Sequence, residues 1–417
     1  MSDSSPAANK PTTVIVGGGQ AGSEAATALR QAGFEGRVFL IGEEPYPPYR
    51  RPPLSKAFLS GDAAAETLLI KPLSAYEKAG IEYIGGMRVV NVERELKRVE
   101  LQDGRELDYD FLILATGGSA RKLSFPGADK SNVHSLRTAD DSIAIRGEFV
   151  EGRKLVVIGG GYIGLEVAAH AIKNKVAVTV LEAAPRVLAR VTAPDMSSFY
   201  EKVHREAGAD VRTGVVVQAF DTEGDKVTAV VLDDGSRVEA DLVVVGVGIS
   251  PAVSLALDAG LEVSNGIVTD GNCRTDDPSI FAIGDCANSL NGFLETRVRI
   301  ESVPNAMEQG RIAAAVIVGK TPAPQLPPWF WSDQYDLKLQ MVGLSQGYDH
   351  VVLRGNPDTR SFMAFYLREG QLIAIDSVNR APEFMAGKKL VAERCKPDPA
   401  VLADESVPLK SLLEAAG

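Results

Sequence analysis

A glycine-rich turn between a short hydrophobic strand and a helix limits what this 417-residue chain can fold into more than any other feature. The turn reads Gly17-Gly18-Gly19-Gln20-Ala21-Gly22. It follows a predicted strand at 12–16 and precedes a predicted helix at 23–32, after which a second strand is expected at 37–41. In this setting a G-x-G-x-x-G turn is the fingerprint of a dinucleotide-binding βαβ unit.

The same pattern returns later in the chain. Gly159-Gly160-Gly161-Tyr162-Ile163-Gly164 follows a predicted strand at 154–158 and precedes a predicted helix at 165–173 and a strand at 177–181. In both copies the glycines let the backbone approach a pyrophosphate, and the helix N-terminus supplies free N–H groups. The alternative is a pair of structural glycine turns, which would leave the shared strand–helix setting unexplained.

The repetition extends beyond the glycines. Asp103-Gly104, a hairpin signal, is followed seven residues on by Asp110 and a hydrophobic strand that ends at Thr116. Asp234-Gly235 is followed at the same interval by Asp241 and a strand that leads to Gly248. We therefore predict two related nucleotide-binding modules, with Thr116 and Gly248 among the residues that contact the cofactors.

A third strand signal, 280–283 before Gly284-Asp285, has no fingerprint of its own and is predicted to return to the first module. The Pro-rich stretch 321–328 marks a further boundary. Beyond it we expect strands at 339–342, 350–354, 361–367 and 371–377, and helices at 380–393 and 409–416.

The predicted fold class is therefore α/β, with two Rossmann-like dinucleotide-binding domains and a C-terminal α+β domain. The predicted division is 1–118 for the first part of an FAD-binding domain, 119–248 for an NAD-binding domain, 249–326 for the second part of the FAD-binding domain, and 327–417 for the C-terminal domain.

Acidic residues near the two turns suggest which dinucleotide each module takes. Asp285 is placed to bond a polyol such as the ribityl chain of FAD, although it could instead be a helix N-cap. Glu43, after the second strand of the first module, is the candidate for the FAD ribose. Glu182 ends the corresponding strand of the second module, where a carboxylate binds the ribose hydroxyls of NAD and repels the 2′-phosphate of NADP. Arg186 and Arg190 lie close by and could hold a phosphate, but Glu182 favours NADH.

Composition excludes several classes of protein. A formal net charge of -11 leaves no excess of cations for general nucleic-acid binding. No hydrophobic run reaches the ~18 residues of a membrane span. Residues 1–11 lack the features of a signal peptide, and the three cysteines form no close pair, so we expect a cytoplasmic protein with no metal site.

At the two glycine turns and the acidic residues near them, the chain resembles the putidaredoxin reductase group of ferredoxin–NAD⁺ reductases, which have the glutathione-reductase fold. The resemblance covers essentially the whole chain. Its most specific stretches are 51–56 (RPPLSK), 159–169, 284–286 (GDC), 299–305 (RIESVPN) and 329–335 (WFWSDQY). The family pattern implies FAD contacts at Ala21, Glu43, Lys56, Val89, Arg137, Asp285 and Val303.

The resemblance also assigns roles to three residues as catalytic candidates. It implies that Lys56 and Glu166 meet beside the flavin N5 atom, where the lysine stabilises the reduced flavin; the alternative is two exposed charges. Trp331 is expected to cover the flavin ring, or else to be a tryptophan in the core of a domain interface. Val303-Pro304 is predicted to start a helix that ends near 318 and whose N-terminus faces the flavin.

Disulfide reductases of this fold need a redox cysteine pair after the first βαβ unit and a histidine near the C-terminus, and both are missing here. The remaining chemistry is hydride transfer from NADH to FAD and single electrons out to a partner. The family implies an acidic [2Fe-2S] ferredoxin that serves a cytochrome P450 or a ring-hydroxylating oxygenase. Docking positions implied by the family are Lys71, Arg311 and Lys410, with Arg297, Arg299 and Lys338 as additional candidates; each could equally be an ordinary surface charge.

Two other functions remain open from the sequence. One is a diaphorase that reduces quinones or small oxidants. The other is an FAD- and NAD-binding protein resembling apoptosis-inducing factor, although no targeting segment or long basic insertion is present.

Overall fold

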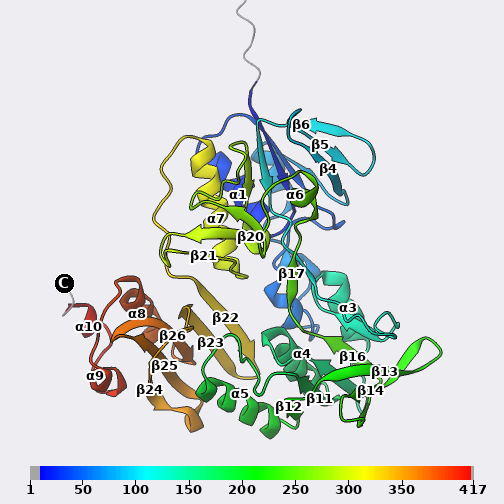
Figure 1. Cartoon of the computed structure of the whole chain (residues 1–417), viewed down its shortest axis with the longest axis vertical. Helices are drawn as coiled ribbons and strands as arrows, with labels where there is room; N and C mark the ends of the chain where they lie inside the picture. The colour runs from blue at the N-terminus through cyan, green and yellow to red at the C-terminus, as the bar shows by residue number, and fades with distance from the viewer. Residues whose placement is uncertain (1–9, 415–417) are drawn as a thin grey trace, which may run out of the picture. The chain divides into compact units, whose positions relative to one another are not determined.

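The computed structural model describes residues 10–414, which form two compact units (Figure 1). Unit 1 consists of the described part of Met1–Arg50, Leu68–Ser119 and Pro251–Leu326. Unit 2 consists of Arg51–Thr67, Ala120–Ser250 and the described part of Pro327–Gly417.

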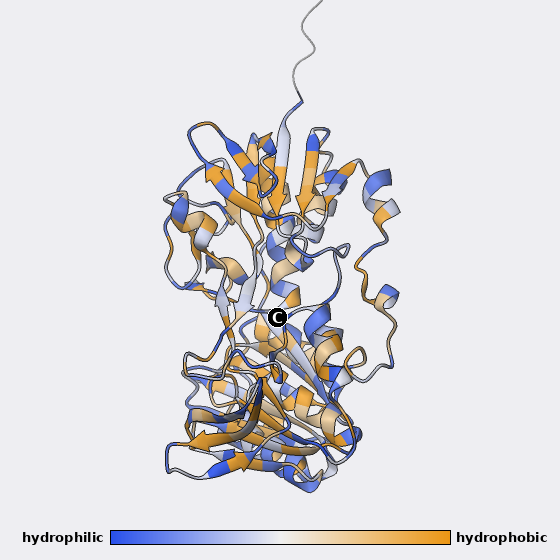
Figure 2. Cartoon of the chain, turned by 90° about the vertical axis from the view of Figure 1, so that its right-hand side faces the viewer, coloured by the Kyte–Doolittle hydropathy of each residue, from blue (hydrophilic) through white to orange (hydrophobic). Residues whose placement is uncertain are grey.

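Unit 1 is built on a five-stranded parallel sheet with the strand order β19-β7-β1-β2-β3. Its strands are β1 (Thr12–Val16), β2 (Arg37–Ile41), β3 (Ile81–Ile84), β7 (Phe111–Leu114) and β19 (Ile280–Ala282). They are largely hydrophobic along their length (Figure 2), as expected for a parallel sheet that is covered on both faces. The pairing of β19 with β7 confirms that the chain returns to the first module near residue 280.

Two helices of unit 1 pack closely against each other, α1 (Gln20–Gln31) and α7 (Val303–Ile317). The close approach depends on Gly310, because a Cβ atom there would lie 3.0 Å from the backbone nitrogen of Ala25. Ser302 caps α7 by accepting a hydrogen bond from the backbone N–H of Asn305, so the predicted helix start at Val303 is confirmed.

Smaller sheets complete unit 1. One is the meander β4 (Val89–Glu93), β5 (Arg98–Leu101) and β6 (Glu106–Asp108); the other contains β18 (Ile267–Thr269), β20 (Ala287–Asn291) and β21 (Thr296–Val298). Its short helices are α2 (Leu73–Lys78) and α6 (Ser254–Asp258).

Unit 2 contains a second parallel sheet, with the order β12-β11-β10-β16-β9. Its strands are β9 (Val133–Ser135), β10 (Lys154–Ile158), β11 (Ala177–Glu182), β12 (Asp210–Thr213) and β16 (Leu242–Val245). Its helices are α3 (Ala139–Gly147), α4 (Tyr162–Lys173) and α5 (Pro194–Glu206), and its meander is β13 (Val217–Glu223), β14 (Lys226–Leu232) and β15 (Arg237–Glu239).

The two parallel sheets repeat each other strand by strand, as the sequence predicts. In each, the fingerprint strand pairs on one side with the strand after its helix and on the other with the strand after the Asp-Gly signal. Each Asp-Gly pair forms the turn between the last two strands of a meander, Asp103-Gly104 between β5 and β6, and Asp234-Gly235 between β14 and β15.

The C-terminal part of unit 2 is an antiparallel sheet with the order β22-β23-β26-β25-β24. Its strands are β22 (Trp329–Gln334), β23 (Leu337–Gly343), β24 (His350–Asn356), β25 (Ser361–Arg368) and β26 (Gln371–Val378). The helix α8 (Ala381–Ala392) is followed by the short α9 (Pro399–Ala403) and α10 (Ser411–Glu414).

Two details of this part differ from the sequence prediction. The strand β22 and the helix α9 were not expected as separate elements. Of the predicted helix at 409–416, the described residues form the single turn α10, and residues 415–416 lie outside the described range.

Candidate functional site

Of the three fingerprint glycines in the turn of unit 1, Gly17, Gly19 and Gly22, packing requires two and leaves the third free. Gly17 has φ +123°, and a Cβ atom there would lie 2.1 Å from the Ala115 carbonyl oxygen. A Cβ atom at Gly22 would lie 2.0 Å from the Gly17 carbonyl oxygen. At Gly19 it would meet no atom within 4 Å. The space over Gly19, at the N-terminus of α1, is therefore where a pyrophosphate group fits this turn.

The first turn of α1 suits an anion for a second reason. Its N-cap residue is Gly19, which has no side chain to bond the free N–H groups, and the turn contains no acidic residue. The N–H groups and the positive end of the helix dipole are thus available to a phosphate.

The other predicted FAD contacts of unit 1 lie on several elements. Glu43 is exposed just after β2, 3.6 Å from Arg88. Thr116 donates its hydroxyl to the carbonyl of Ala252 at 2.6 Å, and Val89 is buried in β4. Their contacts with FAD stay predictions.

Asp285 and Ala21 lie next to the same glycine. Asp285 is inside the 3-10 turn η3 (Gly284–Cys286), whose N-cap is Ile283, so the alternative that Asp285 is a helix N-cap is wrong. A Cβ atom added to Gly284 would lie 3.0 Å from the Cβ of Ala21. The amide oxygen of Gln309 accepts from the Gly284 N–H at 2.7 Å, which fixes η3 to helix α7.

The glycine turn of unit 2 shows the same division of roles. Gly159 has φ +110°, and a Cβ atom there would lie 2.5 Å from the Gly246 carbonyl oxygen. A Cβ atom at Gly164 would lie 2.1 Å from the Gly159 carbonyl oxygen, whereas at Gly161 its nearest neighbour would be 4.0 Å away. This turn also fits a dinucleotide.

Glu182 lies directly over this turn. Its carboxylate accepts from the backbone N–H groups of Gly160 at 2.6 Å and Ala184 at 2.7 Å. These bonds fix the side chain at the carboxyl end of β11, where the ribose hydroxyls of a dinucleotide bind in this fold.

The two arginines near Glu182 differ in their availability. The Arg186 guanidinium donates to the carbonyls of Thr192 and Ala189 and to the Ser197 hydroxyl, so it stabilises its own loop. Arg190 is exposed, and its guanidinium lies near Gly248, 3.6 Å from where a Cβ would be. Of the two, Arg190 is therefore the cation open to a ligand.

The two fingerprint residues after Gly161 point in different directions. The Tyr162 hydroxyl donates to the sulfur of Met341 at 2.8 Å, and its ring packs on Phe330, so burial raises its pKa well above the usual value. The side chain of Ile163 is 41% exposed at the start of α4, which leaves it accessible to a ligand.

Lys56 and Glu166 form an ion pair within unit 2, with 2.7 Å between Nζ and Oε2. Glu166 is only 1% exposed and also accepts hydrogen bonds from the hydroxyls of Ser55 and Ser332. The alternative of two exposed helix charges is therefore wrong. A buried carboxylate persists when it is paired and fully hydrogen-bonded, and all three donors to Glu166 are provided by this chain.

The other two predicted site residues of unit 2 are less buried. Trp331 is half-buried on β22, with its ring 5.5 Å from that of Trp329 and 6.3 Å from that of Phe330. The backbone N–H of Arg137 donates to Asp141, and its carbonyl accepts from Arg51 at 2.6 Å.

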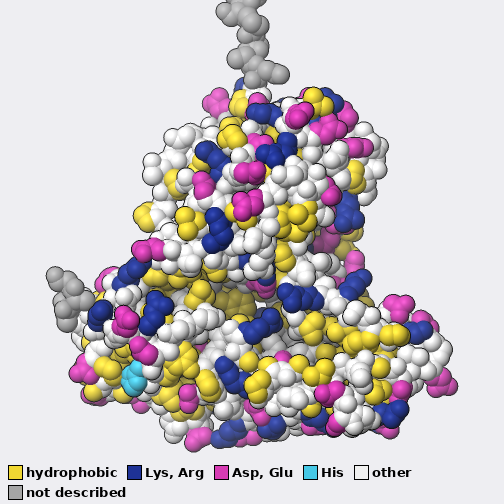
Figure 3. Space-filling model, viewed as in Figure 1, with side chains coloured by type: hydrophobic (Ala, Val, Ile, Leu, Met, Phe, Trp, Pro, Cys, Tyr) yellow, Lys and Arg dark blue, Asp and Glu magenta, His cyan; other side chains and the backbone are white. Residues whose placement is uncertain are grey.

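The predicted docking residues lie in both units. Arg311 pairs with Glu24 at 2.6 Å and is largely exposed, and Lys71 is half-buried; both are in unit 1. Lys410 is exposed in unit 2. Lys and Arg side chains are interspersed with Asp and Glu on the face drawn in Figure 3.

Two additional docking candidates have structural contacts instead. Arg297 donates to the carbonyls of Thr269 and Asn288, both at 2.7 Å. Arg299 is only 9% exposed and pairs with Glu301. Both side chains stabilise unit 1 itself. The third candidate, Lys338, is exposed on β23.

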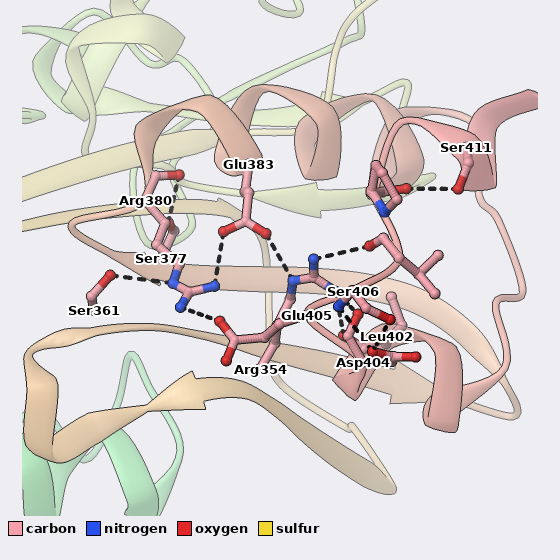
Figure 4. A network of polar contacts seen from close by, with 12 residues as sticks. Arg354, Ser361, Ser377, Arg380, Glu383, Leu402, Asp404, Glu405, Ser406 and Ser411 are labelled. Atoms are coloured by element: carbon pink, nitrogen blue, oxygen red, sulfur yellow. Dashed lines mark hydrogen bonds and ion pairs between the residues drawn. The ribbon is translucent and has the colours of Figure 1, made fainter.

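Arg354 fixes the segment that leads to Lys410 (Figure 4). Although only 2% exposed, it pairs with Glu383 at 2.8 Å and donates to the carbonyls of Leu402, Asp404 and Val407. Four bonds from one buried guanidinium therefore set the path of the chain before Lys410.

The three cysteines are all described, free and buried. Burial raises the pKa of Cys273 and of Cys286, which disfavours the reactive thiolate. Across residues 10–414 no group of three or more His, Cys, Asp or Glu side chains is arranged to hold a metal ion. No helix within that range is long and hydrophobic enough to cross a membrane.

Comparison with known proteins shows which family the chain belongs to. Residues 11–310 match the family model of the pyridine nucleotide-disulphide oxidoreductases, and residues 329–413 match that of a reductase C-terminal domain. The chain belongs to the pyridine nucleotide-disulphide oxidoreductase family. Enzymes of this family use FAD and NAD(H), which confirms the two predicted cofactors and the fold class.

Individual relatives agree with this assignment. The chain is 49% identical to putidaredoxin reductase CamA of Pseudomonas putida over 408 residues, 97% of each chain. It matches putidaredoxin reductase in its covalent complex with putidaredoxin with a TM-score of 0.95 and 49% identity, over 97% of this chain and 99% of that one. It also matches the ferredoxin reductase for the CYP199A2 system of Rhodopseudomonas palustris, with a TM-score of 0.94 and 43% identity over 98% and 100% of the two chains. The resemblance predicted from the sequence is confirmed.

Proposed function

We propose that this chain is an FAD-containing reductase that passes electrons from NADH to an acidic [2Fe-2S] ferredoxin, which in turn serves an oxygenase such as a cytochrome P450. The proposal rests on one observation, which is that this member of a disulphide oxidoreductase family has no cysteine pair. The chain has both dinucleotide turns of a disulphide oxidoreductase family, yet its three cysteines are free, buried and unpaired with one another. A dithiol of this chain cannot be the electron acceptor, so the electrons must leave the flavin for an external acceptor.

When bound, FAD would accept a hydride from NADH and give up the electrons one at a time. In this proposal, the turn at Gly17–Gly22 and the N-terminus of α1 hold the FAD pyrophosphate, and the turn at Gly159–Gly164 holds that of NADH. Glu182 selects the unphosphorylated ribose.

Lys56 and Glu166 serve the flavin together in this proposal. Lys56 supplies a positive charge that stabilises the negative charge of the reduced ring, and Glu166 keeps the lysine in one position. Trp331 covers the ring. This accords with the burial of the ion pair, because a charge in a site shielded from water acts more strongly than one at the surface.

The relatives support ferredoxin as the partner, because one matched structure is a complex with putidaredoxin and another is a ferredoxin reductase. The proposed docking cations are Lys71, Arg311 and Lys410. A cytoplasmic location is also proposed, on the ground that all three cysteines are free.

The test uses the wild-type holoenzyme and a variant in which Cys273, Cys286 and Cys395 are replaced by alanine. Both should oxidise NADH in the presence of ferredoxin, and neither should reduce glutathione disulfide. Loss of ferredoxin reduction in a folded cysteine-free variant that keeps its FAD would contradict the proposal, because it would give a thiol a role in electron transfer.

A further inference from the structure

A chain of hydrogen bonds connects the buried carboxylate of Glu166 to a histidine on helix α5. Glu166 Oε1 accepts from the Ser332 hydroxyl at 2.5 Å. The Ser332 oxygen accepts from the amide nitrogen of Gln334 at 3.2 Å, and the Gln334 amide oxygen lies 2.8 Å from Nε2 of His204. Nδ1 of His204 is 3.0 Å from the Tyr335 hydroxyl.

The three intermediate residues are closed off from solvent, while the far end of the chain is not. Ser332 and His204 are 0% exposed and Gln334 is 1% exposed, whereas Tyr335 is 37% exposed. Only the bond from Gln334 to Ser332 joins residues that are close in the sequence. His204 is 130 residues from Gln334, and Ser332 is 166 residues from Glu166, so the other hydrogen bonds depend on how distant segments pack.

The ionised carboxylate forces one direction on every bond in the chain. An ionised carboxylate can only accept hydrogen bonds, so Ser332 must donate its single hydroxyl proton to Glu166. Ser332 can then only accept from Gln334, which must present its NH₂ group to the serine and its carbonyl to His204. The histidine must therefore carry its proton on Nε2, and its Nδ1 accepts from Tyr335.

Neutral His204 agrees with this order, since burial lowers the pKa of His204 to about 4. All the donors point toward Glu166, and aligned hydrogen bonds in a buried site reinforce one another. The Lys56 ammonium approaches the other carboxylate oxygen, Oε2.

We propose that His204 is a positioning residue that acts through Gln334 and Ser332 to fix the ionised carboxylate of Glu166 against Lys56. This inference rests on the proposed function, in which the Lys56–Glu166 pair stabilises the flavin during reduction by NADH. His204 does not touch the flavin in this scheme. His204 instead fixes the orientation of the Gln334 amide, which in turn fixes the direction of the Ser332 hydroxyl.

The first test is the rate of FAD reduction by NADH in the anaerobic holoenzyme, measured by stopped-flow absorbance without ferredoxin. His204→Leu removes the Nε2 donor and should slow reduction about tenfold, the size expected for losing one hydrogen bond that supports a charged group. His204→Gln can present an NH₂ group at the same place and should restore the rate to within about twofold. A rate for His204→Gln as low as that for His204→Leu would show that the residue only fills space.

Ser332→Ala tests the same path from its other end, and if His204→Leu does not fold, the histidine tautomer of the wild type still tests the proposal. Ser332→Ala breaks the chain at its first bond and should slow reduction to a similar extent, and the effects of the two variants should not add because both act through one path. Additive effects would overturn the proposal. Tyr335→Phe is the matched control: it removes the last donor, beyond His204, and should leave the rate within about twofold of wild type.

The second readout is the histidine tautomer, which does not depend on activity. The sequence contains only 4 histidines, so ¹⁵N-histidine NMR of the oxidised holoenzyme can be assigned by comparison with His204→Gln. We expect the neutral Nε2–H form in wild type and in Tyr335→Phe, and a mixture of tautomers in Glu166→Gln, because an amide at position 166 no longer imposes a direction. A protonated Nδ1 in the wild type would refute the directional chain. Failure of the wild type to reduce ferredoxin would instead refute the proposed function, and neither readout here uses ferredoxin.

Discussion

Replacing Glu182 should weaken the preference for NADH over NADPH. The carboxylate is fixed over the second glycine turn by the N–H groups of Gly160 and Ala184, so it cannot move away from a 2′-phosphate without losing both bonds. NADPH therefore brings a second negative charge close to a fixed one, whereas NADH brings hydroxyls that the carboxylate can accept from.

The size of the effect follows from the exposure of the site. Two unit charges 4 Å apart repel by about 4 kcal/mol at an effective dielectric constant of 20, and by about 1 kcal/mol in water. Glu182 is half-buried, so a value of about 2 kcal/mol is expected, which is roughly thirtyfold in kcat/KM.

The variants Glu182→Gln and Glu182→Ala separate charge from structure. Glutamine removes the charge but keeps one oxygen, which can accept from only one of the two N–H groups, so it should lose the discrimination against NADPH at a smaller cost in folding stability than alanine. Alanine should lose the same discrimination and also leave the two N–H groups unpaired. The assay is the ratio of kcat/KM for NADH and NADPH with ferricyanide as acceptor. Equal use of both cofactors by the wild type would refute the reasoning.

Three further predictions follow from individual contacts. Lys56→Met should slow flavin reduction and lower the flavin potential while FAD stays bound; an unchanged rate and potential in a redox titration would mean that its pairing with Glu166 does not serve the flavin. Arg311→Glu should lower ferredoxin turnover and weaken its salt dependence but leave ferricyanide reduction unchanged. The control Glu24→Gln, which frees the Arg311 charge from its ion pair, should not lower ferredoxin turnover. A parallel loss of ferredoxin and ferricyanide reduction in Arg311→Glu would contradict a role in docking. Burial raises the pKa of Asp376 to about 6, so its ionisation costs the folded state stability that is absent at low pH and is reached in full as pH rises through 6. Asp376→Asn should therefore lose less stability than wild type between about pH 4 and pH 8 in denaturant unfolding, and an equal loss in both proteins would refute this.

The repeated core of the fold could be predicted because its signals are local. Hydrophobic runs of strand length, glycines at fixed spacing and Asp-Gly turns each act within about ten residues, and all recur in both modules. The strand β22 was missed because its sequence, Trp329–Gln334, does not alternate between hydrophobic and polar residues, and most of its side chains are only half-buried. Its place in the sheet is set by pairing with β23.

The environment of the candidate site could not be derived from local pattern. Glu166 lies in a helix where either burial or exposure is compatible with the sequence, and only the resemblance to a family indicated that it meets Lys56. Ser55, Ser332 and His204 complete that environment from positions far along the chain, and their contacts depend on how distant segments pack. The sequence signals were that Ser55 and Ser332 each fall within a stretch that resembles the family.

The central claim, that electrons pass from NADH singly to a ferredoxin, is tested most directly by stoichiometry. The holoenzyme is mixed anaerobically with a limiting amount of NADH and an excess of oxidised [2Fe-2S] ferredoxin, and reduced ferredoxin is counted by its absorbance. Because NADH supplies two electrons and each cluster takes one, the account predicts two reduced ferredoxins for each NADH, with the enzyme reoxidised at the end. A flavin that is reduced by NADH but transfers nothing to ferredoxin, while it still reduces a quinone, would contradict the account and favour a diaphorase.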